Sequence, residues 1–261
     1  MFFRSLPAEI GYRLWLAPEG IRTLIRFGLW LGLMGHGLVS LGIGPGHEIH
    51  LRFVEALGWF SNPEGFLGIH GIVEICFAQL MLLPLIAAIA VRVFMIYVFG
   101  VALVAVNFYH FKVGSYLGLA EFLRRMPWFV MAWYLLKPSE PRFIPFLRIA
   151  VSLMFLSHGM ASLGFMGLNG MHVEIAGTIF TGDWAARVVE FSGYTDIILG
   201  ILLLFRINPA VVSKIAFGWI SLVVMLSYAL AFSDGLFRTA FLLCSGIVAF
   251  NKNAYLKWVL K

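Results

Sequence analysis

The stretch RFGLWLGLMGHGLVSLG at residues 26–42 recurs as RIAVSLMFLSHGMASLG at residues 148–164. The Arg, the His-Gly pair and the Ser-Leu-Gly triplet occupy the same positions in both copies, 122 residues apart, as are His36 and His158. Both copies are otherwise mostly apolar, and a helix needs about 20 apolar residues to cross the hydrocarbon core of a membrane. We therefore expect a membrane-spanning helix at the same place in two tandem copies of one unit.

The same offset aligns polar residues well beyond this stretch. The aligned pairs are His50 with His172, Gly71 with Gly193, Glu74 with Asp196, and Arg92 with Lys214. Chance matching of apolar residues is common in membrane proteins, but matching of His, acid and Arg at one shared offset is not. The predicted organisation is an N-terminal segment at the membrane interface (1–24), a first four-helix repeat (25–138) and a second (139–261).

The composition places most of the chain in lipid. Of 261 residues, 61% are hydrophobic and 12% charged, and the mean hydropathy is +0.92. A soluble domain carries about 25% charged residues, so this chain has too little polar surface to face water. The net charge of +6 is typical of cytoplasmic loops in membrane proteins, and we predict no nucleic-acid partner.

The fold class predicted from these patterns is an all-α integral membrane protein of about eight transmembrane helices. Closed barrels, the other spanning architecture, alternate polar and apolar residues, and these segments do not. Because each repeat has four helices, an even number, both copies would enter the membrane from the same side. They would then be parallel repeats related by a pseudo-twofold axis along the membrane normal. The predicted spans are 25–43, 66–90, 92–111, 116–136, 146–166, 188–206, 209–232 and 236–251.

The placement of Lys and Arg predicts the orientation. With the N-terminus inside, thirteen of the 19 basic residues fall in inner segments and six in outer ones. Among the outer six are Arg124, Arg125 and Arg238. Cytoplasmic loops carry the excess of Lys and Arg, so we expect both termini in the cytoplasm.

Each repeat places one His and one acid at similar depth. His36 and Glu74 each lie about ten residues from the predicted inner end of their span, roughly 15 Å at 1.5 Å per residue, and His158 and Asp196 do the same. Ionisable residues in a span normally face a bundle interior or a wet cavity. These four residues are the candidate catalytic residues, exchanging protons or binding a polar head group. Alternatively, the pairs only hold adjacent helices together.

Further polar residues lie beside the first pair. His70 precedes Glu74 by four residues and therefore shares its helix face, whereas the second copy has Ser192 there. The first half is therefore the better candidate for chemistry. His70 and Tyr194 are candidate ligand-binding residues.

Four paired histidines raise the possibility of haem b. His50 and His172 lie in outer segments, 47–60 and 169–182, of which the first is amphipathic and expected at the interface. His36 with His158, and His50 with His172, could each ligate a haem iron. Alternatively, the histidines hydrogen-bond within the bundle. The motifs HExxH, CxxC, Walker A and GxGxxG are absent, and we predict no metal site.

The repeated elements resemble the DoxX/DoxD family of bacterial four-helix membrane proteins. The resemblance rests on Arg26 with His36-Gly37, on Arg148 with His158-Gly159, and on the acids Glu74 and Asp196 ahead of Leu-rich runs. It covers about 22–112 and 144–234, and a tandem fusion would correspond to a dimer of the usual unit. Some members of that family are subunits of thiosulfate:quinone oxidoreductase, and others resemble membrane anchors for redox partners.

The functional expectation is a membrane subunit of a quinone-linked redox system in the bacterial cytoplasmic membrane. Its buried His–carboxylate pairs would bind a quinone head group or relay protons. The expected partners are the lipid bilayer and other protein subunits. Two alternatives remain open at this point: a non-catalytic anchor or scaffold in a larger complex, and a transporter or small-lipid binder.

Overall fold

The computed structural model describes residues 18–44, 46–83, 86–112, 117–138, 142–165 and 169–251, and these residues form helices and turns without any strand. Eight of the helices in this part of the chain are long, and two, α3 and α8, are short. The helices are α2 (Pro18–Ser40), α3 (Gly46–Leu57), α4 (Pro63–Leu82), α5 (Ala87–Lys112), α6 (Leu117–Leu136), α7 (Phe143–Ser162), α8 (Asn169–Gly177), α9 (Trp184–Leu204), α10 (Pro209–Leu230) and α11 (Phe232–Phe250).

Each of the eight predicted spans has a long helix at its place, but two boundaries are wrong. The predicted span 66–90 runs across a break, because α4 ends at Leu82 and α5 begins at Ala87. Pro84 follows in the sequence and has no amide hydrogen to continue a helix. The first helix begins at Pro18, seven residues before the predicted start at 25. Of the predicted interfacial segment 1–24, residues 1–17 lie outside the described residues.

Five of the described helices are long and apolar enough to cross a membrane: α4, α5 over Ala87–Val104, α7, α10 and α11. Their outward faces carry large apolar side chains, such as Ile69, Ile96 and Met225, which are exposed to 67%, 74% and 69%. Apolar surface on this scale has no favourable contact with water and indicates lipid as the surrounding solvent. The chain is therefore a multi-pass helical membrane protein.

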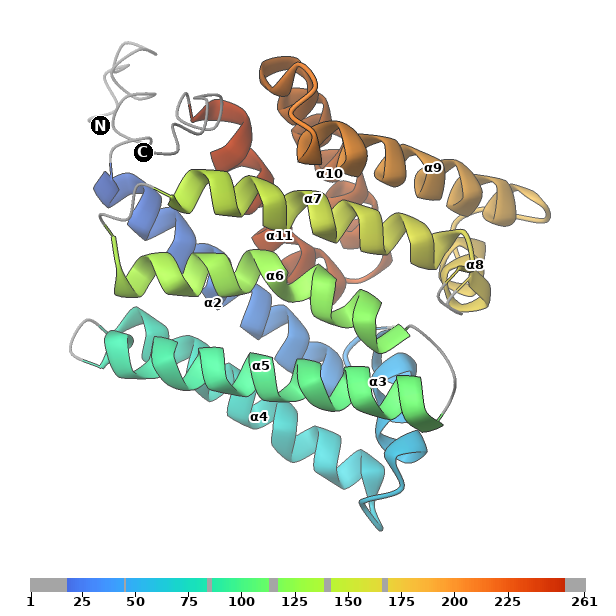
Figure 1. Cartoon of the computed structure of the whole chain (residues 1–261). Coiled ribbons are helices and arrows are strands. Elements are labelled where there is room, and N and C mark those ends of the chain that lie inside the picture. The colour runs from blue at the N-terminus through green and yellow to red at the C-terminus, as the bar shows by residue number, and fades with distance from the viewer. Residues whose placement is uncertain are drawn as a thin grey trace, which may run out of the picture.

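Four helices, α2, α6, α7 and α11, form the centre of the bundle, with α4 and α5 on one side and α9 and α10 on the other (Figure 1). Helix α2 packs on α4 and α11, and α7 packs on α9 and α6. Much of the centre is apolar, and its fully buried side chains include Ile25, Leu29, Met131, Leu147 and Cys244.

The short helices α3 and α8 lie at the same end of the bundle (Figure 1). They follow the carboxyl ends of α2 and α7, and they occupy the segments expected from sequence at 47–60 and 169–182. With 12 and 9 residues they are about 18 Å and 14 Å long at 1.5 Å per residue, too short to span a bilayer. They cover one end of the bundle instead.

Glycines allow the first two helices of each half to approach closely. A Cβ on Gly71 of α4 would lie 2.6 Å from the carbonyl oxygen of Gly37 on α2. In the second half, a Cβ on Gly159 of α7 would lie 2.6 Å from the carbonyl oxygen of Gly193 on α9. Real Cβ atoms do not come so close to a backbone oxygen. Small residues at such crossings permit tight packing of membrane helices, and here they bring the polar residues beside them together.

Candidate functional site between the two halves

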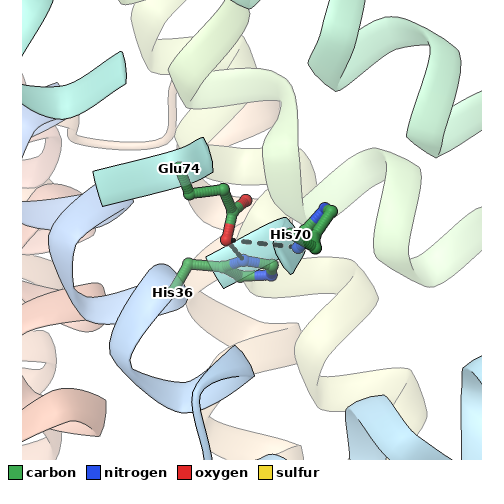
Figure 2. A group of neighbouring side chains, drawn as sticks. All are labelled: His36, His70 and Glu74. Atoms are coloured by element: carbon green, nitrogen blue, oxygen red, sulfur yellow. Dashed lines mark hydrogen bonds and ion pairs between the residues drawn. The ribbon is translucent and has the colours of Figure 1, made fainter. Parts of the chain in front are cut away.

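The first His–acid pair joins α2 to α4. The His36 Nδ1 atom lies 2.7 Å from Oε2 of Glu74, whose side chain is buried with 3% of its surface exposed (Figure 2). Helix α4 is fixed at its start by Pro63 and by the Asn62 side chain, which accepts a hydrogen bond of 2.9 Å from the Gly65 amide. Its close contact with α2 at Gly71, one turn from Glu74, sets the His36–Glu74 distance.

The His36–Glu74 pair lies nearer one end of the bundle than the depth calculated from the predicted spans. His36 is four residues before Ser40, where α2 ends, and His158 is four residues before the end of α7 at Ser162. The difference arises because α2 begins seven residues before the predicted span 25–43 and also ends three residues before that span does. The histidines therefore lie close to the covering helices α3 and α8.

Tyr97 of α5 is a third member of this group, and sequence reasoning did not single it out as a site residue. Its hydroxyl donates a hydrogen bond of 2.8 Å to Oε1 of Glu74 and also contacts Nε2 of His70. His70 lies on the same face of α4 as Glu74, with its Nδ1 3.6 Å from Oε2 of Glu74. Both carboxylate oxygens of Glu74 thus face polar partners.

The second half repeats this arrangement with different residues. The His158 Nδ1 atom lies 2.6 Å from Oδ2 of Asp196, and the Trp219 Nε1–H donates to Oδ1 of Asp196 at 2.7 Å. Trp219 is 122 residues after Tyr97, so the repeat offset could have identified both aromatic residues as partners of the acids. With Ser192 at the His70 position, the second half has a simpler group.

The short helices add one His to each pair. His50 of α3 lies 3.3 Å from the Ser40 hydroxyl, and His172 of α8 lies 2.9 Å from the Ser162 hydroxyl, in both cases through Nδ1. The ring centroids of His36 and His50 are 4.5 Å apart, and those of His158 and His172 are 5.2 Å apart. Each half therefore presents two adjacent imidazoles, and in all four the Nδ1 atom already has a partner.

All four histidines line one cavity of about 210 Å³. Residues from both halves form its wall, including Asp196 but not Glu74. Of the two carboxylates that are paired with a histidine, the one that borders the cavity is thus that of the second half, whereas sequence reasoning favoured the first half. At about 30 Å³ per water, this volume holds about seven waters, or a small polar head group in their place.

Three arginines also reach the cavity, with two acids beside them. The wall includes Glu121, Arg124 and Arg125 of α6 and Asp234 and Arg238 of α11. Each acid precedes an Arg by four residues, so the two share a helix face. Glu121 forms ion pairs with Arg124 and Arg125, and Arg238 donates a hydrogen bond of 2.6 Å to the Ser227 hydroxyl.

The predicted spans 116–136 and 236–251 contain these arginines, and their assignment to the outer side of the membrane stays a prediction. Arg124 and Arg125 lie in the third turn of α6 and Arg238 in the second turn of α11, and all three face the interior of the bundle. Two buried polar atoms in this group, Nε of Arg124 and Oδ2 of Asp234, have no hydrogen-bond partner among the described residues. Buried polar atoms normally have one, so the cavity has hydrogen-bonding capacity left for a ligand or water.

Two sequence-based expectations do not fit the cavity. Tyr194 has 54% of its surface exposed on α9 and is not part of the cavity wall. Haem does not fit either, because pockets for drug-sized ligands measure roughly 300–1,000 Å³ and a haem is no smaller than such ligands. Two haems held by the proposed histidine pairs would also have to share this one cavity of about 210 Å³.

The three side chains drawn in Figure 2 are the one group of possible metal ligands found among the described residues. Ligand atoms of His36, His70 and Glu74 all lie within 4.8 Å of one another. The chemistry of the site is thus divided between the halves, with a three-ligand group in the first and a cavity-facing His–Asp pair in the second.

No family model, curated protein or solved structure matches this chain.

Proposed function

We propose that this protein is a DoxX-like membrane subunit of a quinone-linked redox system, and that its central cavity binds the quinone head group. The observation that carries the proposal is the cavity itself, whose wall collects four histidines and Asp196 from both halves of the chain. Concave, enclosed sites with a few converging polar groups are the usual form of small-molecule binding sites. A purely structural role would need the His–acid pairs but no cavity beside them.

The proposal includes the architecture expected from the repeat. All eight long helices would cross the membrane, as two parallel four-helix repeats with a pseudo-twofold axis along the membrane normal. The contacts support this, because α2 on α4 matches α7 on α9, and α6 on α7 matches α11 on α2. Helices α2, α6 and α9 are not among the five that are long and apolar enough to cross a membrane by themselves. Each carries charged residues, and several of these, such as Arg125 and Asp196, face the interior.

The His158–Asp196 pair would exchange protons with the head group. Asp196 holds the Nδ1 atom of His158 at 2.6 Å, which orients the ring and leaves Nε2 to bind a quinone oxygen. Imidazole suits this role because its proton affinity lies near neutral pH. Reduction of a quinone to a quinol takes two electrons and two protons. The electrons would come from a redox partner protein, and the protons would pass through His158.

The arginines would stabilise the negative charge that builds up on the quinone oxygens when electrons arrive. Cationic donors that the protein holds in place act strongly on developing charge and need no reorganisation. Arg125 and Arg238, from α6 and α11, approach the cavity from different helices. With the bacterial cytoplasmic membrane as the location and both termini inside, this site would lie in the outer half of the bilayer.

The test is quinone binding by the purified protein in detergent, followed by quenching of its tryptophan fluorescence with a short-chain quinone. We expect Asp196→Asn to weaken binding about 10-fold or more, since His158 loses the charged partner that orients it. The matched control is Glu190→Gln, which removes an exposed acid from the same helix and should bind as the wild type does. Equal affinity for wild type and Asp196→Asn would refute the proposed site.

A further inference from the structure

In the group formed by His36, His70 and Glu74, the close contact between His70 and Glu74 is not a hydrogen bond. The Nδ1 atom of His70 is buried and has no hydrogen-bond partner in the part of the chain that the structure describes. It points toward Oε2 of Glu74 at 3.6 Å (Figure 2), which is too long for a hydrogen bond. Leaving a buried nitrogen without a hydrogen-bond partner costs free energy. We therefore expect this atom to have a partner that the protein itself does not supply.

Tyr97 determines which nitrogen of His70 carries the proton. Its hydroxyl has one proton, which it donates to Oε1 of Glu74, so toward His70 it can only accept. The Nε2 atom of His70 is therefore the protonated nitrogen, and a neutral ring then has a lone pair on Nδ1. That lone pair faces the carboxylate oxygen of Glu74. Two electron-rich atoms facing each other in a buried site call for a cation between them.

We propose that His36 Nδ1, His70 Nδ1 and Glu74 Oε2 bind a divalent transition-metal ion of the zinc or ferrous class. Metal–ligand bonds of about 2.0–2.1 Å in a tetrahedral site separate ligand atoms by about 3.3 Å. The observed separations from Glu74 Oε2 are 2.7 Å to His36 and 3.6 Å to His70, on either side of that value. The ion would replace the proton shared by His36 and Glu74, and that proton would be released on binding.

The donor set decides the class of metal. Magnesium and calcium prefer sites made of oxygen atoms, whereas two imidazoles and one carboxylate suit zinc and ferrous iron. Three protein ligands leave at least one coordination position open, as in catalytic rather than structural metal sites. Tyr97 would hold both Glu74 and His70 in place, in the way that hydrogen bonds behind the ligands orient them in known metal sites.

The second half lacks this site and serves as an internal control. Ser192 and Trp219 stand where the first half has His70 and Tyr97, so of the three positions aligned with the proposed ligands only His158 and Asp196 carry possible ligands. Two ligands hold a metal weakly. The inference is thus one metal ion per chain, in the first half alone, and it does not depend on quinone binding at the cavity.

The test is metal retention by the purified, full-length protein in detergent. After removal of metals with a chelator, the protein is dialysed against Zn²⁺, and the bound metal is counted by mass spectrometry. Co²⁺ is used in a parallel sample, because its visible absorption reports the number and geometry of the ligands. We expect one ion per chain in the wild type and in His158→Ala, and at least about 100-fold weaker binding in His70→Ser.

His70→Ser introduces the residue that stands at the aligned position of the second half, so we expect α4 to tolerate it. Tyr97→Phe keeps all three ligands and should weaken binding by about 10- to 100-fold through their loss of orientation. Circular dichroism checks that each variant keeps its helical content. Equal retention by wild type and His70→Ser would mean an adventitious metal only, and an equal loss in His158→Ala would contradict a site confined to the first half.

Discussion

At the scale of single residues, each buried carboxylate has both oxygens engaged by different helices. Glu74 contacts His36 and Tyr97, and Asp196 contacts His158 and Trp219. Removing one partner from such a group leaves a buried charge uncompensated, which typically costs about 3–5 kcal/mol. The acids therefore fix the orientation of the His36 and His158 rings. The Nε2 atom of each ring is thereby held in one direction.

The histidines of the short helices lie outside the spanning helices and have lowered proton affinity. Burial lowers the pKa of His172 well below its usual value of 6.5, and His158, Arg124 and Arg238 nearby lower this pKa further. The unfolded chain takes up a proton at this residue near pH 6.5, but the folded protein does so only at a much lower pH. Its stability should therefore fall as the pH drops below about 6.5, by at most about 1.4 kcal/mol per pH unit.

Thermal unfolding in detergent between about pH 7.5 and pH 5 measures this effect. The wild type should lose melting temperature as the pH falls, and His172→Gln should lose less, because glutamine does not titrate. Parallel curves for the two proteins would show that His172 is not buried in its neutral form. The same direction holds for the pKa of His50, which burial also lowers.

The repeat offset and the depth along each helix predicted which His and acid lie close together. They did not predict Tyr97 and Trp219, because depth does not tell which way a side chain points around its helix. The predicted spans contained Arg125 and Arg238, but the sequence did not show that these side chains line a cavity inside the bundle.

At the scale of helices, the glycine crossings position the site. Gly71→Ala would place a Cβ 2.6 Å from the Gly37 carbonyl oxygen, so α4 must move away from α2 and the His36–Glu74 contact must lengthen. Gly68→Ala is the matched control, because a Cβ at this position on the same helix has no atom within 4 Å. We expect Gly71→Ala to lower the melting temperature and metal retention, and Gly68→Ala to leave both unchanged or raise stability slightly.

Equal stability and equal metal retention of the two variants, measured side by side, would contradict the role given to this crossing.

The glycines themselves were visible in the sequence at the repeat offset, as Gly71 and Gly193. Their contact partners were not, since a crossing point depends on the tilt between two helices. The break near Pro84 was missed for a related reason, because hydropathy stays high through residues 82–90.

At the scale of the whole molecule, the cavity exists only because the halves pack against each other. Helices α2 and α6 of the first half and α7 and α11 of the second form the centre (Figure 1), and all four contribute to the cavity wall. Hydropathy predicted the helical membrane class, which the structure confirms, and the division into two tandem units stays a prediction. The shared cavity could not be predicted, because the sequence does not specify which faces of the two units meet.

Photo-crosslinking with a light-activated quinone analogue tests the proposed quinone site between the two halves most directly. Labelled peptides are identified by mass spectrometry, with an excess of unlabelled quinone as competitor. We predict labels near His36 or His50 in the first half and near His158 or His172 in the second, all of them lost on competition. Labels confined to the lipid-facing surfaces of α4, α5, α9 and α10, or labels insensitive to the competitor, would contradict a quinone site between the two halves.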